Sequence, residues 1–405
     1  MNILFLTLLD FLSYEDHNIY CDLIREFTRN GHEVFCISPV ERRTGHETSL
    51  LESGHLLKLK IGNTQKTNTL EKGISTLFLE YQFVSAIKRF FSDIHFDLVL
   101  YSTPPITLQK AVAYVKNRDS AVTYLLLKDI FPQNAVDLGM MKKEGWKGIV
   151  YRYFRTKEKR LYALSNYIGC MSQANVDYVL KKNPEIPPYK VHVSPNSVEP
   201  QILLEKPDRK KSLREKYRIP LDKTVFLYGG NLGRPQNVPF IISCLQASRQ
   251  AEEAFFVVCG SGTDYPRLAA YQEAEKQENL LVLPGLPREE YEEFAGCCDV
   301  GLIFLDYRFT IPNFPSRLLS YMQKGMPVLA CTDTATDIGR VITEGGFGWW
   351  CPSNDAERFA NQVCRVCQED LSQKFRKSAA YLLEHFSVKE SYRAILHALE
   401  AGREQ

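Results

Sequence analysis

The stretch VFLYGGNLGRPQN, residues 225–237, decides the fold because an apolar run passes directly into a glycine-rich turn. Runs of this length and composition are typical of strands buried in parallel sheets. Gly229, Gly230 and Gly233 free backbone N–H groups to approach an anion, and a following helix would add the positive end of its dipole. Arg234 could donate two further hydrogen bonds to that anion. A tight strand-to-helix turn with an arginine in water explains the same letters equally well.

The same alternation of strands and helices continues on both sides of this turn. A helical stretch at 18–30, for example, ends at Gly31 as a helix C-cap should. Strands that alternate with helices predict parallel sheets covered on both faces, so each half of the chain is expected to be a doubly wound α/β domain. The expected strands are Ile3–Leu9, Val34–Ser38, Leu98–Ser102, Val122–Leu127 and Tyr167–Met171, then Val225–Tyr228, Phe255–Cys259, Leu280–Leu283, Val300–Phe304, Pro327–Ala330 and Gly348–Cys351.

A segment rich in Pro, Lys and Glu, residues 195–224, separates the two halves. We therefore predict an N-terminal domain at 1–195, a linker at 196–222 and a C-terminal domain at 223–386, with the last helix, about 387–405, packing back on the N-terminal domain. A chain of 405 residues is long enough for two such cores. Ligands of open parallel sheets bind at the carboxyl ends of the strands, so two facing domains would enclose a cleft.

Composition excludes several classes of protein. The formal net charge of +2 excludes a globally basic nucleic-acid binder. The eleven cysteines are scattered in apolar surroundings, which indicates buried thiols in a reducing compartment. The N-terminal run lacks the basic region of a signal peptide, and no apolar run approaches the roughly 18–20 residues that span a bilayer. We expect a cytoplasmic protein, or one bound peripherally to the inner face of the cell membrane.

Two more segments of the second half are compatible with anion binding. In Ile311–Ala330 a turn with two prolines leads into a short helix whose first turn carries Arg317. In Val257–Gly262 glycines again follow a strand. Arg317 would share a cleft with Arg234 if the strands are ordered as in a doubly wound sheet. A surface arginine on an amphipathic helix is the plain alternative.

The order of these pieces resembles the nucleotide-binding domain of glycosyltransferase family 4, retaining enzymes of the GT-B fold. The matching segments are the strand–GG-x-x-G turn at Tyr228–Arg234, VVCGSG at Val257–Gly262, VLPGLPREE at Val282–Glu290 and FPSRLLSYMQKGMPVLA at Phe314–Ala330. In the first half GHEV, STPP, LLLKDIFPQNAVDLG and SPNSV look like the subgroup that builds bacterial capsular and O-antigen polysaccharides. The resemblance covers nearly the whole chain and implies two Rossmann-like domains facing a central cleft.

By this resemblance Arg234 and Arg317 would grip the diphosphate of a nucleotide sugar, expected to be a UDP sugar. Family members often carry a lysine just after the first arginine and a Glu-x7-Glu pair around the second, whereas this chain has Gln236, Pro312 and Ser320 at those places. What holds the donor ribose and sugar hydroxyls is therefore left open. The donor residues carried over are Gly229, Gly230, Asn231, Gly233, Arg234, Gly260, Gly262, Gly285, Leu286, Arg317, Leu318 and Ser320.

Glycosyl transfer needs charge stabilisation on the departing phosphate and a base for the incoming hydroxyl. Arg317 and Arg234 can stabilise the charge on the departing phosphate, so neither a metal nor another cofactor is expected. Asp129 follows the strand Val122–Leu127 and is the expected base, although it could instead cap a helix or pair with Lys128. Asp16 and His17, after the first strand, are competing catalytic candidates, and Asp16 would serve equally well as a helix N-cap.

Residues 142–160 hold eight Lys and Arg against two Glu, and apolar residues recur there at helical spacing. A basic amphipathic helix with aromatic residues can lie on an anionic membrane surface. We predict that it docks the enzyme beside a polyprenyl-diphosphate-linked saccharide acceptor. An ordinary helix with its apolar stripe on the core and its charges in water is the alternative, and no nucleic-acid motif accompanies the charge. The membrane and acceptor residues are Trp146, Lys147, Arg152, Phe154 and Arg155.

Two other functions are compatible with the same residues. A sugar-nucleotide epimerase on this scaffold would need an acid and a base over the donor sugar and no acceptor. A non-catalytic sugar-nucleotide-binding protein would explain the absent glutamate pair.

Overall fold

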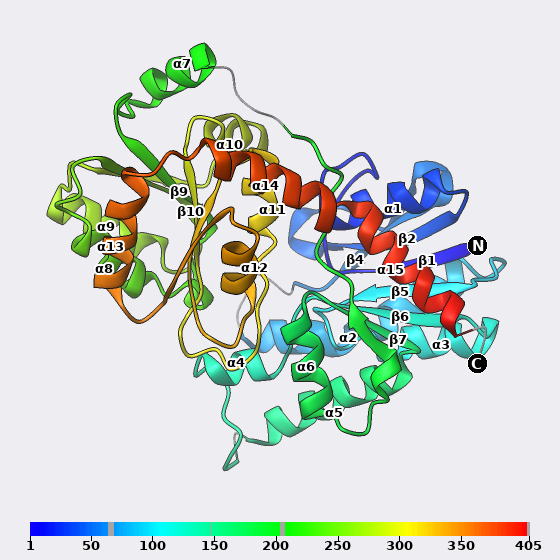
Figure 1. Cartoon of the computed structure of the whole chain (residues 1–405). Helices are drawn as coiled ribbons and strands as arrows, with labels where there is room; N and C mark the ends of the chain where they lie inside the picture. Colours follow the sequence, from blue (N-terminus) through cyan, green and yellow to red (C-terminus); the bar gives the residue numbers. More distant parts are fainter. Residues whose placement is uncertain (64–68, 147, 203–206, 403–405) are drawn as a thin grey trace. The chain divides into compact units, whose positions relative to one another are not determined.

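The computed structural model describes residues 1–63, 69–146, 148–202 and 207–402. The chain divides into two compact units, Met1–Glu199 with Ser387–Gln405, and Pro200–Phe386. Both units are α/β, as the alternation of strands and helices predicts (Figure 1). We describe each unit by itself.

The N-terminal unit is built on an eight-stranded sheet in the order β3-β4-β2-β1-β5-β6-β7-β8. All neighbours pair in parallel except β3 and β4. Its strands are β1 Asn2–Leu6, β2 Glu33–Glu41, β3 Ser49–Leu51, β4 Leu56–Ile61, β5 Leu98–Ser102, β6 Val122–Leu127, β7 Tyr167–Cys170 and β8 Val191–Val193. Its helices are α1 Ile19–Arg29, α2 Thr69–Phe90, α3 Gln109–Asp119, α4 Gln133–Asp137, α5 Gly148–Leu164, α6 Gln173–Lys182 and α15 Val388–Ala401.

Strand β1 lies at the centre of this sheet, with β2 on one side and β5 on the other. The chain winds outward in one direction through β2 and β4, then returns to β5 and winds outward in the other. The loops after β1 and β5 therefore part at the carboxyl edge, which is the place where doubly wound sheets bind ligands. The Ser102 hydroxyl donates to the Thr7 hydroxyl at 3.3 Å and ties the two strand ends together.

The last helix, α15, belongs to the N-terminal unit and packs along α1 (Figure 1). Its apolar face, which includes Val388, Ile395 and Leu399, is part of the same buried cluster as Phe27 of α1. The Tyr392 ring lies edge-on to that of Phe27, with centroids 5.0 Å apart.

The C-terminal unit has a six-stranded, all-parallel sheet in the order β11-β10-β9-β12-β13-β14. Numbered within the unit, this is the 3-2-1-4-5-6 order of the dinucleotide-binding fold, with its ligand crevice between β9 and β12. The strands are β9 Thr224–Asn231, β10 Ala254–Ser261, β11 Leu280–Pro284, β12 Val300–Phe304, β13 Val328–Thr332 and β14 Gly348–Pro352. The helices are α7 Pro207–Tyr217, α8 Val238–Ala247, α9 Tyr265–Glu275, α10 Arg288–Ala295, α11 Arg317–Gln323, α12 Ile338–Glu344, α13 Ala356–Cys367 and α14 Ser372–His385.

Part of the segment predicted as a linker, 196–222, forms helix α7 of the C-terminal unit. Arg214 is buried and holds this helix in place. Its guanidinium donates to the Cys297 carbonyl at 2.9 Å and to the Asp299 carboxylate at 2.6 Å. The sequence does not reveal this anchor, because the burial of Arg214 depends on Asp299, which lies far from it along the chain.

All eleven cysteines are free thiols, and only Cys364 and Cys367, both on α13, are not buried. Within the described residues, no helix combines the length and apolar character that crossing a bilayer requires.

Candidate functional site

The guanidinium of Arg317 lies directly against Gly230, at the end of β9. A Cβ built on Gly230 would overlap a guanidinium nitrogen, and the glycine φ of +129° is itself one that L side chains rarely adopt. Arg317 opens α11, which follows β12, so its contact with Gly230 places it at the crevice between β9 and β12. The Arg317 Nη1 also donates a long hydrogen bond of 3.5 Å to the Tyr291 hydroxyl on α10.

Tyrosine hydroxyls, rather than carboxylates, surround Arg317. The fully buried Tyr321 accepts a hydrogen bond from the Gly229 N–H at 3.2 Å, and burial raises the pKa of Tyr321. Burial likewise raises the pKa of Tyr291 well above its ordinary value. Both hydroxyls therefore stay neutral at physiological pH, and among the described residues no ion pair compensates Arg317. A cation held this way favours an anionic ligand, because desolvated charge without a partner is costly.

Arg234 stands on the same turn, four residues after Gly230. It begins the short 3-10 helix η4, Arg234–Gln236, and its side chain is exposed. The Gln236 amide oxygen accepts from the Gly233 N–H at 3.2 Å and from the Asn231 side chain at 3.0 Å, which fixes the turn. The structure thus brings both predicted arginines to the loops that follow β9 and β12.

The glycines of this site mostly make room for protein atoms. A Cβ on Gly229 would overlap the Tyr291 hydroxyl, and one on Gly260 would overlap the Gly230 carbonyl. Gly262, with φ +152°, has no room beside the Leu232 backbone. The turns after β9 and β10 can therefore pack against each other. Close packing against protein atoms, which the sequence interpretation did not foresee, explains Gly229, Gly260 and Gly262, which we had assigned to the anion site: Gly229 makes room for Tyr291 of α10, and the other two for the turn after β9.

The remaining predicted donor residues divide into accessible and inaccessible ones. Gly285 and Asn231 are exposed, and Leu286 and Ser320 are half-buried. The Leu318 side chain is fully buried, and its N–H already donates to the Pro315 carbonyl at 3.2 Å. Leu318 therefore supports helix α11 and has no group left to bind a donor.

In the N-terminal unit, Asp129 follows β6 at the carboxyl edge of the sheet. Both of its carboxylate oxygens lie 2.8 Å from the Asn134 side-chain nitrogen, and burial raises the Asp129 pKa to about 6. Neither plain alternative for this residue holds. Helix α4 begins after Pro132, and Lys128 donates instead to the Ser194 and Pro195 carbonyls at 3.2 and 3.3 Å. A carboxyl group with a pKa near 6 suits a general base.

Asp16 and His17 lie in the loop after β1. The Asp16 carboxylate accepts from the Leu12 N–H at 3.1 Å, while the N-cap of α1 is Asn18, so Asp16 does not cap the helix. His17 is exposed. Asp16 also lines a cavity of ≈ 710 Å³ together with Phe11 and the buried Lys58. This cavity opens at the carboxyl ends of β1 and β2, where a substrate of this unit would bind.

Comparison with known proteins agrees with this geometry. Residues 209–381 match the family "Glycosyl transferases group 1". The C-terminal domain is a glycosyl transferases group 1 domain. Over 315 residues, 77% of this chain and 76% of the relative, the sequence is 26% identical to the "Probable glycosyltransferase WbjE" of Pseudomonas aeruginosa. The protein is a glycosyltransferase, and the predicted resemblance is confirmed at this level.

Solved glycosyltransferase structures have the same fold over nearly their whole length. Anabaena Alr3699/HepE, crystallised in complex with UDP, is 16% identical, with a TM-score of 0.66 over 99% of this chain and 100% of that one. WaaG, a glycosyltransferase involved in lipopolysaccharide biosynthesis, is 12% identical, with a TM-score of 0.63 over 97% of this chain and 98% of that one. These likenesses and the two sheets, parallel except for the β3–β4 pair, confirm the GT-B fold.

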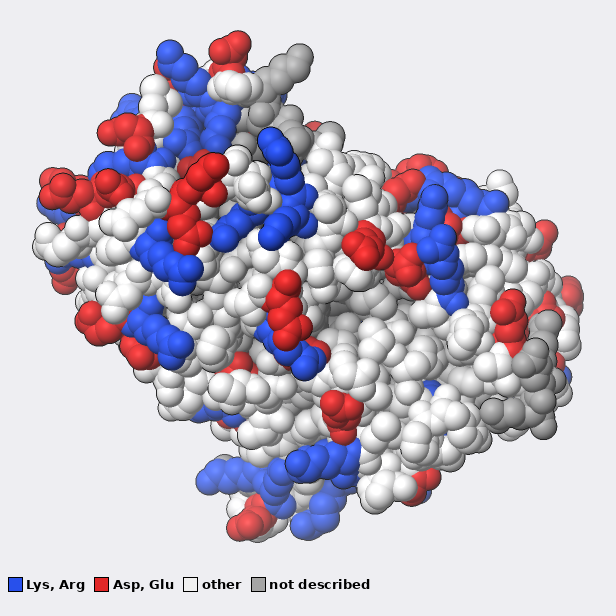
Figure 2. Space-filling view, in the orientation of Figure 1, with Lys and Arg blue, Asp and Glu red and all other residues white. Residues whose placement is uncertain are grey.

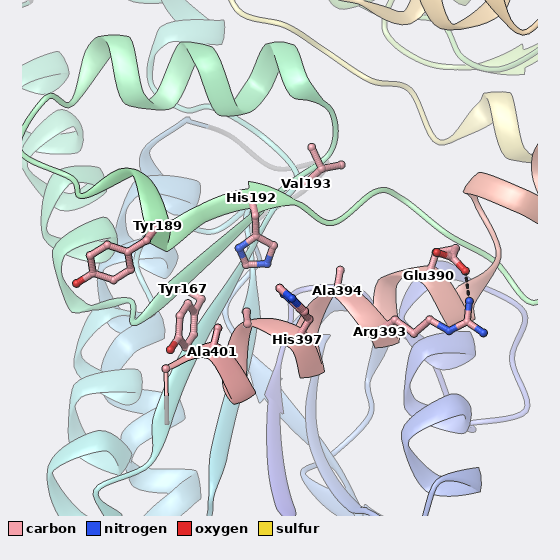
Figure 3. A pocket seen from close by; sticks show the side chains of 11 residues that line it. Tyr167, Tyr189, His192, Val193, Glu390, Arg393, Ala394, His397 and Ala401 are labelled. Carbon is pink, nitrogen blue, oxygen red and sulfur yellow. Dashed lines mark hydrogen bonds and ion pairs between the residues drawn. The ribbon is translucent and has the colours of Figure 1, made fainter. Parts of the chain in front are cut away.

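The glycosyltransferase has another cavity, of ≈ 460 Å³, between α15 and the edge strand β8 (Figure 3). None of the residues that we predicted as functional lines it. His192 and His397 point into it from the two elements, and a His192 ring nitrogen lies 2.7 Å from the Tyr124 hydroxyl. Burial, with a smaller contribution from His397, lowers the His192 pKa to about 4. This cavity belongs to the packing of α15 on the sheet.

The residues predicted to meet the membrane divide into outward and inward groups. Trp146 is 78% exposed, and Arg152 is also exposed. Phe154 packs instead edge-on against Phe131, with ring centroids 5.1 Å apart. Arg155 pairs with Glu158 and donates to the Asn183 side chain at 2.6 Å. Phe154 and Arg155 therefore hold α5 on the unit and do not face outward. Lys147 lies outside the described residues.

Proposed function

We propose that this glycosyltransferase moves a sugar from a UDP-sugar donor to a lipid-linked saccharide, with retention of configuration, in the synthesis of a bacterial surface polysaccharide. The observation that carries the proposal is the half-buried Arg317, seated on Gly230 among neutral hydroxyls at the β9/β12 crevice. A nucleotide diphosphate supplies the anion that this cation needs, and Arg234 on the same turn adds a second donor. Anabaena Alr3699/HepE, of the same fold, was crystallised with UDP.

In this mechanism the bond between the sugar C1 and the β-phosphate oxygen breaks, and the acceptor hydroxyl oxygen bonds to C1 from the same face. The two arginines stabilise the negative charge that develops on the leaving UDP, a role that needs no metal. The acceptor proton passes to Asp129, whose raised pKa makes it a competent base near neutral pH. Asp16 remains the competing base.

The acceptor class rests on relatives and on surface character. One relative carries the name WbjE as a probable glycosyltransferase, and WaaG acts in lipopolysaccharide biosynthesis. The exposed Trp146, two residues before the basic helix α5, supports attachment to the inner face of the cell membrane.

The proposal is tested by incubating the protein with radiolabelled UDP sugars and bacterial lipid extract in the presence of a metal chelator. Transfer of label to lipid is expected. Sugar release without any acceptor would favour an epimerase or hydrolase. Tight UDP binding without transfer to any extract would favour a non-catalytic binding protein.

A further inference from the structure

Two helices of the N-terminal unit expose apolar side chains on their outward faces. On α5 the exposed residues Ile149, Val150 and Tyr153 follow Trp146 at helical spacing. On α2, Leu77, Phe78 and Tyr81 form a second such group, with Phe78 and Tyr81 each 60% exposed. Nothing in the sequence near α2 is unusually basic, so this second group is visible only in the fold.

A polar cluster joins the two groups into one surface. Glu80 of α2 accepts a hydrogen bond from the Lys157 ammonium of α5 at 3.0 Å and from the Lys110 N–H of α3 at 3.3 Å. The Lys110 ammonium donates in turn to the Tyr81 hydroxyl at 2.9 Å. Lys157 also lies over the Tyr153 ring, 6.0 Å from its centroid. Tyr81 and Tyr153 therefore flank the same cluster, and the exposed groups of α2 and α5 lie on either side of it.

The exposed charge around this surface is mostly positive. Lys and Arg side chains gather along the lower edge of Figure 2, where Figure 1 places α5 and the turn before it. On α2, on α5 and in residues 139–146, Glu144 is the only acidic side chain among the charged ones that the structure describes as exposed. The others are Lys88, Arg89, Lys142, Lys143, Arg152, Lys159 and Arg160.

We infer that the outward faces of α2 and α5 form one docking surface for an anionic bilayer, which rests on the proposed function because it delivers the site to a lipid-linked acceptor. Apolar side chains ringed by lysine and arginine complement both the acyl layer and the anionic headgroups. A second copy of this chain would bring the same positive rim against the first, which repulsion disfavours.

The position of this surface gives it a role in catalysis. Lys110 is the second residue of α3, which begins directly after the loop that follows β5, so the docking surface borders the carboxyl edge of the sheet. Phe131, two residues after Asp129, packs on Phe154 at the inner side of α5. A bilayer held on the outer side of α5 thus lies one helix away from the loop of the proposed base.

The test is flotation of the full chain with vesicles of phosphatidylglycerol and phosphatidylcholine in equal amounts, and with phosphatidylcholine alone. The variant Leu77→Ser/Phe78→Ser is expected to lower partitioning onto the mixed vesicles about ten-fold or more, because two large apolar groups are lost from the interface. The matched control Leu221→Ser/Leu383→Ser changes two similarly exposed leucines of the other unit and is expected to partition as the wild type does. Lys142→Glu/Lys143→Glu is expected to remove the preference for phosphatidylglycerol.

Unchanged partitioning of Leu77→Ser/Phe78→Ser would overturn the inference. So would a vesicle-free wild-type dimer that this variant converts to a monomer, since the surface would then be an interface between copies. UDP-induced thermal shifts, measured on every variant, report the donor site separately. Wild-type circular dichroism and melting temperatures of the variants show that reduced flotation is not misfolding. A wild type that UDP does not shift counts against the proposed donor and leaves the flotation result standing.

Discussion

The guanidinium of Arg317 occupies the space in which a side chain of residue 230 would begin. One residue on α11 and one at the end of β9 thus form a single structural unit, although 87 positions separate them by their residue numbers. Neutral tyrosine hydroxyls complete its surroundings and leave the positive charge for a ligand.

Gly230→Ala is expected to displace Arg317 and to lower kcat/KM for the donor by about ten-fold or more, the effect of losing one charge-assisted hydrogen bond. The new methyl group overlaps the guanidinium, and the φ of +129° adds backbone strain. Gly31→Ala is the control, because Gly31 also has a positive φ, +77°, but a Cβ there would meet nothing within 4 Å. If Gly230→Ala kept full turnover, the contact would have no part in donor binding.

Asp129→Asn is expected to reduce kcat by about two orders of magnitude or more, the usual contribution of a general base. In the wild type, activity should rise as the pH increases through about 6, because Asp129 must lose its proton to act. The measurement is a pH profile of kcat/KM for wild type, Asp129→Asn and Asp16→Asn. An acid limb that survives in Asp129→Asn and disappears in Asp16→Asn would move the role to Asp16.

His192 should make the N-terminal unit sensitive to acid. Its folded pKa of about 4 lies below the ordinary value of 6.5, so the unfolded chain takes up a proton first and stability falls between pH 6.5 and pH 4. His192→Gln is expected to flatten this part of the melting-temperature curve and leave the region above pH 7 nearly unchanged. Identical slopes of melting temperature against pH for wild type and His192→Gln in this pH range would refute the role given to His192.

Asp299 should be a major source of stability for the C-terminal unit. It accepts from the buried Arg214 at 2.6 Å and from the Val225 N–H at 2.7 Å, so Asp299→Ala leaves both groups without this partner and should cost about 3–5 kcal/mol. Glu293→Ala removes the half-buried partner of the exposed Arg209 and should cost about 1 kcal/mol or less. Urea denaturation measures both. Equal losses would show that the Arg214–Asp299 pair is no stronger than a surface pair.

The sequence predicts the architecture well because its signals are local. Every strand expected from an apolar run is present, since the apolar run that marks a buried parallel strand is formed by the strand's own residues. Strand β4 was missed because LLKLKI contains two lysines. Lys58 is nevertheless buried, since its ammonium donates to Asp10 at 2.5 Å and to Ser38 at 2.9 Å. Such a long-range compensation cannot be inferred from the strand alone.

The site is predictable only in part, because several of its contacts join residues that lie far apart in the sequence. The glycine turn and the two arginines stand out as motifs, and the strand order brings them to one crevice. Tyr291 was missed because its hydroxyl reaches Arg317 only after α10 has packed on the sheet. Tyr321 carried a usable signal, because it lies one helical turn after Arg317 on α11. The inward orientation of Phe154 and Arg155 depends on their contacts with Phe131 and Glu158. Helical spacing alone does not reveal these contacts.

The most direct test of the account is titration calorimetry of UDP against wild type, Arg317→Ala and Arg317→Lys, with circular dichroism to establish that each protein is folded. The account predicts that Arg317→Ala weakens UDP binding by about ten- to hundred-fold, the value of one or two charge-assisted hydrogen bonds, and that Arg317→Lys recovers part of the affinity. Wild-type affinity for UDP in a folded Arg317→Ala protein would contradict it.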